Sequence, residues 1–350
     1  MFNAKIAALS LTSACGITTA LGQGFGYGFN ATAGINAYPV GVYEVNFTSG
    51  VATPLVTYGP AQQSATAVTQ PNGLAFASDR GADGMIFFAD DSTRNLGFYD
   101  RSTMSFGSAG DLSAFGYTWA SAVNAVRNGG YHNGGYYFVP NGTDDLVRAA
   151  VNGSGAITSV TKVVDLFATP PSGYTTGALL NGGDLVITTA GILYGTTTVD
   201  PDGAGGANPT GRFWTVDLNA ATPSYTDIGL VNTSDAFLVN GLNQNGNSDV
   251  YRGLAYGTDG NVFGNYDFSS ATPPSQDPSH RWYLIDPATG TGTLQSAGSL
   301  PYSLADLTRG STTSVVPEAS TWAVLGPVML SGLWLLKRRN SARWPVSGSK

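Results

Sequence analysis

The sequence is poor in cysteine, histidine and charge. Its 350 residues include one Cys and two His, and 11% of them are Asp, Glu, Lys or Arg, which is less than half of the roughly 25% usual for a soluble domain. A single cysteine excludes a disulfide framework within the chain, and two histidines supply few ligands for a zinc site. Low charge also excludes long charged helices and coiled coils, whereas 11% aromatic residues are too many for a disordered chain.

Glycine is what the chain has in excess. Its 47 Gly residues are about twice the usual share, and together with 42% hydrophobic residues they predict a fold rich in strands and turns. The length allows one large domain or two ordinary ones. Between residues 23 and 316, ten basic residues face 22 acidic ones, a formal net charge of −12. A body this acidic repels phosphate backbones, so nucleic-acid binding is not expected.

The first 22 residues have the pattern of a secretory signal peptide. Lys5 gives a positive start, an apolar run of small residues extends from Ile6 to Leu21, and we expect cleavage after Gly22. The alternative is a lipoprotein signal at Cys15, although its Leu lies one position too far from the cysteine. Since Cys15 is the chain's one cysteine, the body that remains after cleavage would contain no thiol.

The C-terminal region combines a proline–glutamate motif, an apolar stretch and a basic cluster. The segment Val316-Pro317-Glu318-Ala319-Ser320-Thr321-Trp322 leads into an apolar run that ends at Leu336, and Lys337-Arg338-Arg339 follows. The run 321–336 is shorter than the roughly 20 residues that a full span prefers. We nevertheless expect a transmembrane helix there, with its basic end in the cytoplasm. Taken by itself, this region predicts a single-pass membrane anchor.

Next to an N-terminal signal peptide, this three-part pattern resembles the PEP-CTERM sorting signal of Gram-negative bacteria. The resemblance covers residues 316–340, and it departs from the family at Ala319, where Pro is usual, and in the tail 341–350. It implies that an exosortase recognises Pro317 and Glu318 and cleaves near them, while the helix and its basic stop hold the chain transiently in the inner membrane. It also implies an association with exopolysaccharide, biofilm or flocs at the cell surface or outside the cell.

Between the two ends, the sequence repeats a short hairpin pattern of alternating apolar residues, then Asp or Asn, then a Thr, Ser or Gly turn. The clearest copy is Trp282-Tyr283-Leu284-Ile285-Asp286-Pro287-Ala288-Thr289-Gly290, which resembles the Tyr-x-Ile-Asp-x-x-Thr-Gly repeats of bacterial β-propellers. The copies are anchored at Asn46, Asp100, Asn152, Asp217 and Asp286. Each anchor is expected to accept a backbone N–H two residues on. Their spacing of 52 to 69 residues is that of a propeller blade of roughly 40–50 residues with loop insertions.

Two further strand candidates precede most hairpins, so the predicted fold class is an all-β propeller with four strands in each blade. We expect five blades, or six if residues 24–29 or 230–242 build a sheet of their own. The orphan strand Tyr302–Leu307 is expected to join the first blade beside residues 36–58 and thereby close the ring, because closure removes exposed sheet edges. A β-sandwich is the competing architecture.

The body shows no motif of a catalytic or metal centre. His132 and His280 lie in predicted loops without a second histidine at a ligand spacing, and Gly-x-Ser-x-Gly is absent. Among several paired carboxylates, the best cation candidate is the loop that contains Asp200 and Asp202, because Ca²⁺ prefers oxygen ligands on flexible acidic loops. A solvated loop is the alternative. Arg127, Tyr251 and Arg252 could line a central channel, but nothing in the sequence identifies a catalytic residue.

The chain is therefore divided into a signal peptide (1–22), a propeller-like body (23–310), a linker (311–316), a sorting segment (317–340) with a transmembrane helix (321–336), and a cytoplasmic tail (341–350). The leading hypothesis is an exported, non-enzymatic surface or matrix protein that is sorted by an exosortase and associated with exopolysaccharide. The rival is an exported propeller enzyme, a lyase or a glycan hydrolase. A third hypothesis is a permanently anchored inner-membrane protein with a periplasmic binding domain.

Overall fold

The computed structural model describes residues 25–30, 39–47, 51–77, 79, 84–120, 125–203, 209–243, 246–266, 281–296 and 304–309. All of them belong to one compact unit, Met1–Thr312. The predicted signal peptide, linker, sorting motif Pro317–Ala319, apolar run and basic stop lie outside the described residues, as does His280. Within these ranges, no helix has the length and apolar character needed to cross a membrane.

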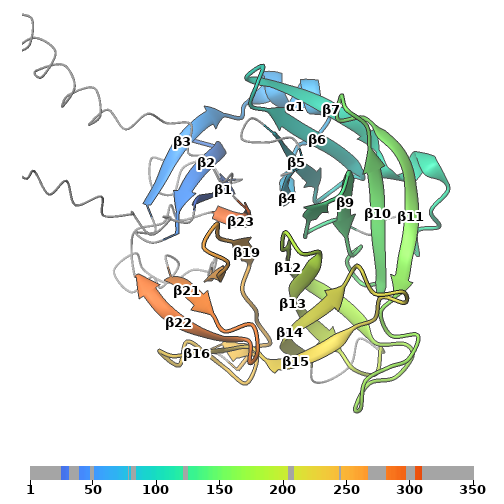
Figure 1. Cartoon of the computed structure of the whole chain (residues 1–350), viewed down its shortest axis with the longest axis vertical. Coiled ribbons are helices and arrows are strands. Elements are labelled where there is room, and N and C mark those ends of the chain that lie inside the picture. The colour runs from blue at the N-terminus through green and yellow to red at the C-terminus, as the bar shows by residue number, and fades with distance from the viewer. Residues whose placement is uncertain are drawn as a thin grey trace, which may run out of the picture. The chain divides into compact units, whose positions relative to one another are not determined.

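The described strands form five main sheets around a common axis, which makes a five-bladed β-propeller (Figure 1). Blade 1 contains β23 (Leu304–Arg309), β1 (Phe25–Asn30), β2 (Gly41–Asn46) and β3 (Val51–Thr57), in this spatial order. Blade 2 contains β4 (Pro71–Phe76), β5 (Met85–Asp90), β6 (Asn95–Asp100) and β7 (Ser105–Asp111). Blade 3 contains β8 (Gly130–His132), β9 (Gly135–Phe138), β10 (Asp145–Val151) and β11 (Ile157–Asp165).

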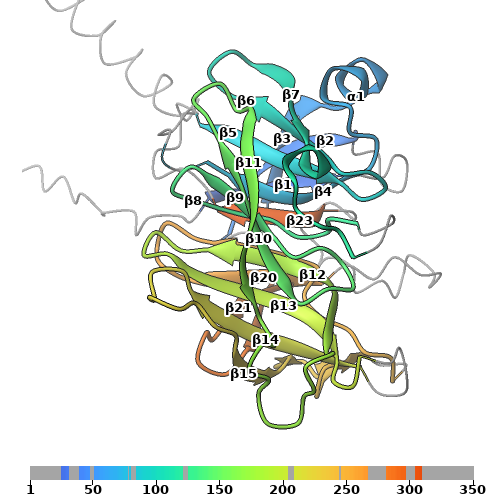
Figure 2. The same cartoon turned by 90° about the vertical axis from the view of Figure 1, so that its right-hand side faces the viewer.

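The remaining two blades complete the ring. Blade 4 contains β12 (Leu179–Ile187), β13 (Ile192–Asp200), β14 (Thr210–Asp217) and β15 (Thr226–Leu230). Blade 5 contains β19 (Gly253–Tyr256), β20 (Val262–Tyr266), β21 (Arg281–Ile285), β22 (Thr291–Ser296) and, at its outer edge, β16 (Asn232–Thr233). A small hairpin of β17 (Leu238–Val239) and β18 (Leu242–Asn243), the helix α1 (Pro60–Thr66) and the short helix η2 (Leu112–Phe115) are additions to these sheets. Seen from the side, blade 3 lies between blades 2 and 4 (Figure 2).

The C-terminal strand closes the ring, and the prediction of five blades is confirmed. The innermost strands contact one another around the axis: β23 with β4 and β19, β8 with β4 and β12, and β12 with β19. β23 pairs with β1, from Gly26 opposite Arg309 to Asn30 opposite Leu304. The segment 230–242 supplies β16 and the hairpin β17–β18 and builds no further blade.

The first blade differs from the expectation in one respect, because β1 lies between the closing strand and β2. A separate sheet built by residues 24–29 was the alternative that would have given a sixth blade, and the structure places β1 in blade 1 instead. The aromatic residues at every second position explain why β1 lies between β23 and β2. Tyr27 and Phe29 are buried and contact the rings of Phe76 and Phe88 of blade 2. Gly28 allows close packing from the other side, since a Cβ there would lie 2.9 Å from the side chain of Leu304.

Hydrophobic clusters fill every space between neighbouring blades of the described ring. Five such clusters exist, each with members from two adjacent blades. Between blades 5 and 1, for example, the Trp282 ring stacks on Phe47 at a centroid distance of 5.2 Å, and Trp282 Nε1 donates to the Phe47 carbonyl at 2.8 Å. Buried aromatic side chains with a satisfied polar atom suit such an interface. The core is therefore a ring of inter-blade layers.

Four of the five Asp and Asn anchors have the turn role that the repeat predicts, while the turn after Asn46 lies outside the described residues. In the hairpins between the third and fourth strands, Ser102 N donates to Asp100, Asn219 N to Asp217 and Ala288 N to Asp286, each at 2.9 Å. Ser154 N donates to Asn152 at 3.0 Å. In each case the donor lies two residues after the acceptor, as in an Asx turn.

Replacing Asp286 by Ala is expected to lower the free energy of unfolding by about 1 kcal/mol, because two acceptor bonds are lost at an exposed turn. These bonds come from Ala288 N and from Thr289 Oγ1, each at 2.9 Å. Urea unfolding measures the effect. Asp286→Asn keeps an acceptor and should cost less than half as much; equal losses for the two variants would contradict a turn-capping role.

Candidate functional site

A polar cleft of about 220 Å³ lies where blades 3, 4 and 5 meet. It is lined by the loops that lead into β8 and β19, by the loop after β9, and by the first half of β12 and the end of β13. The lining residues are Arg127, Asn141, Asn181, Gly182, Gly183, Thr198, Ser248, Asp249, Val250 and Arg252. Because β8, β12 and β19 are innermost strands, the cleft lies close to the axis of the ring.

A β-bulge in β12 shapes the floor of this cleft. Pairing with β13 shifts register between Asn181 and Asp184, and the intervening Gly182 and Gly183 have positive φ values of 68° and 76°. Glycine is required at such positions because it adopts left-handed backbone without steric cost. The side chain of Asn141 holds the bulge by accepting a hydrogen bond from Gly182 N at 3.0 Å. Bulges of this kind commonly terminate pairing beside binding sites.

Two arginine side chains extend into the cleft, and each is fixed by one carboxylate. Arg127 Nε donates to Asp91 at 2.5 Å, and Arg252 Nη2 donates to Asp249 at 2.9 Å. Their side chains are 45% and 46% exposed. A guanidinium has five N–H donors, and within the described residues no further hydrogen bond of either side chain is found. Both side chains line the cleft and keep N–H donors that no hydrogen bond within the described residues uses.

Asp249 positions Arg252, and both oxygens of its carboxylate are already occupied by hydrogen-bond donors. Its carboxylate is buried and accepts from Arg252, from Val250 N at 3.0 Å, from Asn243 Nδ2 at 3.1 Å and from Tyr266 Oη at 2.5 Å. Burial, followed by the charge of Asp249, raises the pKa of Tyr266 above its ordinary value, so this hydroxyl remains a donor. The cleft therefore offers hydrogen-bonding groups of arginine, asparagine, serine and threonine.

The structure brings together two of the three residues that the sequence suggested for a central channel. Arg127 and Arg252 line one cleft, whereas Tyr251 is fully buried and its hydroxyl donates to the carbonyl of Asn232 at 2.8 Å. Tyr251 belongs to the layer between blades 4 and 5, because neighbouring residues of an extended segment point to opposite sides. Sequence reasoning missed Asn181 and its two glycines, although Asn-Gly-Gly inside a strand is a signal for a bulge.

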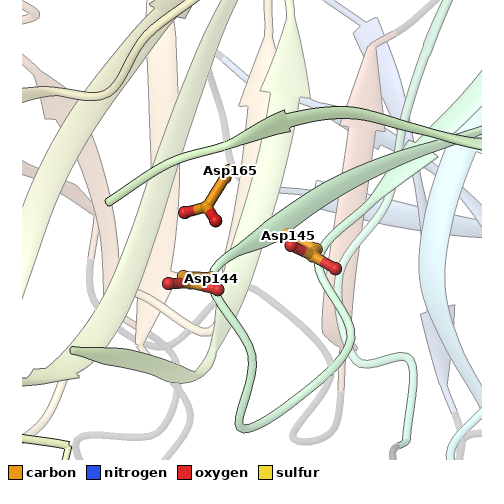
Figure 3. Close-up of side chains that lie close together, drawn as sticks. All are labelled: Asp144, Asp145 and Asp165. Atoms are coloured by element: carbon orange, nitrogen blue, oxygen red, sulfur yellow. The ribbon is translucent and has the colours of Figure 1, made fainter. Parts of the chain in front are cut away.

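An acidic cluster forms a second polar site on blade 3 (Figure 3). Asp145 begins β10, Asp144 directly precedes it, and Asp165 ends β11. One carboxylate oxygen from each lies within 4.8 Å of the others. Lys162 forms ion pairs with Asp145 and Asp165, and Tyr117 Oη donates to Asp145 at 2.8 Å. Burial, then the neighbouring charge of Asp165, raises the pKa of Asp144 to about 6. Three carboxylates at this spacing could hold a cation.

The two residues predicted as a calcium site are not among the three carboxylates of this cluster. Asp200 is buried at the end of β13 and Asp202 is exposed in the turn that follows. Residues 204–208 of the same loop lie outside the described residues, so Ca²⁺ at Asp200 and Asp202 stays a prediction. His132, predicted in a loop, ends β8 instead, and its ring nitrogen contacts Asn133 Nδ2 at 2.9 Å.

Replacing Asp144 by Asn is expected to raise the free energy of unfolding at pH 8 by about 1 kcal/mol, with allowance for solvent screening of a partly exposed group. The folded-state pKa of about 6 exceeds the unfolded value of roughly 3.9, so the folded protein binds this proton more tightly. Stability contributed by Asp144 is therefore present at pH 4, falls as the pH rises to 6, and stays reduced above it. Urea unfolding at pH 4 and pH 8 should show a gain at pH 8 alone.

Asp145→Asn is the matched control for this prediction. It removes the partner of Lys162 and Tyr117 and should destabilise the protein at pH 8, opposite in sign to Asp144→Asn. A variant Asp144→Asn whose stability varies with pH as in the parent protein would contradict the assignment.

Comparison with known proteins gives similarity in structure alone. No protein-family model and no curated protein matches the sequence. Among solved structures, a nidogen/laminin complex aligns with a TM-score of 0.46 and 12% identity, over 83% of this chain and 100% of that chain. A protein of unknown function from Bacteroides thetaiotaomicron aligns with a TM-score of 0.46 and 13% identity, over 83% of this chain and 63% of that one. The PQQ-bound form of aldose sugar dehydrogenase from Streptomyces coelicolor aligns with a TM-score of 0.36 and 13% identity, over 63% and 60%. At these identities and scores, none of the three assigns an activity to this chain.

Proposed function

We propose that this chain is an exported, non-enzymatic binding protein of the cell surface or extracellular matrix, sorted by an exosortase and associated with exopolysaccharide. The observation that carries the proposal is the order of three C-terminal features: Pro317-Glu318, the apolar run 321–336 and the basic cluster Lys337-Arg338-Arg339. A proline keeps the residue before it extended, which favours access by a protease. The apolar run and its basic end favour a transient stay in the inner membrane.

The chemistry of the cleft supports binding as the activity of the propeller. Among its described lining residues the one carboxylate, Asp249, accepts from four donors, and the two arginines are held by Asp91 and Asp249. General acid–base catalysis needs a group that can take or give a proton at the reacting atom. Oriented donors without such a group recognise a ligand and leave its bonds unchanged.

The rival function, an exported glycan-cleaving enzyme, is favoured by one observation. The raised pKa of Asp144, about 6, suits a general acid, and an open cleft of about 390 Å³ nearby is lined by Asp145 and Lys162. If this rival holds, Asp144→Asn abolishes glycan cleavage that the parent protein performs. If the binding function holds, neither protein cleaves glycans.

Mass spectrometry of the mature C-terminus tests the sorting route. In a host with an active exosortase, we expect a C-terminus near Pro317-Glu318, and in a host without one the chain retains its C-terminal helix. Glu318→Ala should prevent processing. Ala319→Pro, which restores the residue usual in the family, should be processed at least as well as the parent. A C-terminus at Lys350 in mature protein from an exosortase-containing host would overturn the proposal.

A further inference from the structure

The cleft between blades 3, 4 and 5 has a donor set that selects one kind of ligand. The body has ten basic residues against 22 acidic ones, yet two of the ten line this one cleft of about 220 Å³. Each arginine uses one N–H group on its carboxylate partner, and the other N–H groups of its planar fork have no hydrogen-bond partner among the described residues. Such forks match carboxylates bidentately.

We propose that this cleft binds one sugar ring that carries a carboxylate, as in a uronic acid unit of a polysaccharide. Arg127 and Arg252 donate to the carboxylate of the ligand, and the side chains of Asn181 and Ser248 bind its hydroxyl groups. This inference rests on the proposed function, because it names the ligand of an exported binding protein.

The charge balance of the cleft favours a singly charged group. Asp91 forms an ion pair with Arg127, and Asp249 forms one with Arg252, so the formal charge of the two pairs sums to zero. A phosphate monoester carries nearly two negative charges at neutral pH, which two neutral ion pairs balance less well than the single charge of a carboxylate. The two oxygens of a carboxylate can accept hydrogen bonds from the N–H groups of the two guanidinium groups.

The size and lining of the cleft favour a single ring that is recognised by hydrogen bonds. A volume of about 220 Å³ lies below the roughly 300–1,000 Å³ of sites for drug-sized ligands, so the cleft holds one ring of a chain whose remainder stays outside. Among the described residues that line it, Val250 has the one aliphatic side chain and none is aromatic. Recognition therefore uses amides, hydroxyls and guanidinium groups, which match the hydroxyl groups of a sugar.

The position of the cleft makes ligand binding and ring stability interdependent. Arg127 lies in the loop that leads into β8 of blade 3, Asn181 belongs to β12 of blade 4, and Arg252 directly precedes β19 of blade 5. A ligand held by all three bridges blades that are otherwise joined through their packing layers. Because it binds the folded ring alone, it should raise the unfolding midpoint as its concentration rises.

Isothermal titration calorimetry of the full chain in detergent, with short oligomers of glucuronic acid, tests the inference. We expect the glucuronate oligomer to bind at least tenfold more tightly than the equivalent glucose oligomer, and more tightly than glucose 6-phosphate. Arg127→Gln should weaken glucuronate binding at least tenfold. Asn181→Asp, which keeps the size and adds a negative charge, should do the same. Arg148→Gln, whose guanidinium contacts the Asn133 carbonyl outside the cleft lining, should bind as the parent protein does.

Several outcomes would overturn the inference. Equal affinity for glucose and glucuronate oligomers would show that the cleft does not recognise a carboxylate. Tighter binding of glucose 6-phosphate would show that it recognises a phosphate instead. Unchanged affinity in Arg127→Gln and Asn181→Asp excludes the cleft. Arg252→Gln is the less suitable variant because it leaves the buried Asp249 without its cation. Failure of the sorting test leaves these affinities unchanged, so the two proposals fail separately.

Discussion

Replacing Leu307 by Asp is expected to abolish the cooperative unfolding transition. Leu307 is fully buried on β23, the innermost strand of blade 1, and packs in the layer shared with blade 5. An ionised carboxylate there has no cation within its hydrophobic cluster, and its burial costs several kcal/mol even after relaxation. That cost is comparable with the roughly 5–15 kcal/mol that holds a typical domain together. Circular dichroism during urea titration would show a broad, non-cooperative change.

The loss of stability should require both the buried position on the closing strand and a charged side chain, and two control variants test these requirements. Leu307→Met keeps the volume and should cost less than about 1.5 kcal/mol. Val51→Asp introduces the same carboxylate on β3, at the outer edge of the same blade, where Val51 is 51% exposed. That change should stay within about 0.5 kcal/mol of the parent. A sharp transition in Leu307→Asp would show that ring closure contributes little to stability.

Closure could be predicted from the sequence because its signals are local. Each hairpin anchor, such as Asp217 or Asp286, is visible as a strand followed by an Asx turn, and an unpaired strand after the last repeat needs a partner. The position of β1 could not be predicted in the same way. Its residues Gly26 and Gly28 weaken the strand signal, and the reason for them is the close approach of β23 from the far end of the chain.

Sequence reasoning could suggest Arg127 and Arg252 as channel residues, but it could not place them in one cleft, for a different physical reason. Arg127 and Arg252 are 125 positions apart, and the ring brings them together because both occupy the loop that enters an innermost strand. Nothing near either residue in the sequence distinguishes it from a solvated arginine. The same holds for Asp165, which joins Asp144 and Asp145 through the pairing of β10 with β11. Local patterns therefore predict the blades, whereas the sites depend on the order in which the blades surround the axis.

Replacing Gly183 by Ala is expected to destabilise the protein by about 4 kcal/mol or more, an effect at the upper limit for single substitutions. A Cβ at this position would lie 1.5 Å from the carbonyl oxygen of Thr196, an atom of the neighbouring strand β13. The φ of 76° adds strain for any residue other than glycine. Thr196 cannot move freely, because its hydroxyl donates to the Tyr251 carbonyl at 2.8 Å and thereby joins blade 4 to blade 5.

The adjacent Gly182 separates the effect of the backbone from that of the collision. Gly182 has nearly the same φ, 68°, but a Cβ there would meet no atom within 4 Å. Gly182→Ala should therefore cost only the left-handed strain, about 1–2 kcal/mol, and should leave a folded ring in which ligand binding can be measured. Urea unfolding of both variants provides the comparison. Equal losses would mean that strand β13 yields to the added methyl group, and the bulge would then be a feature of the backbone angles alone. A much larger loss for Gly183→Ala would mean that the close contact between β12 and β13 fixes the floor of the cleft.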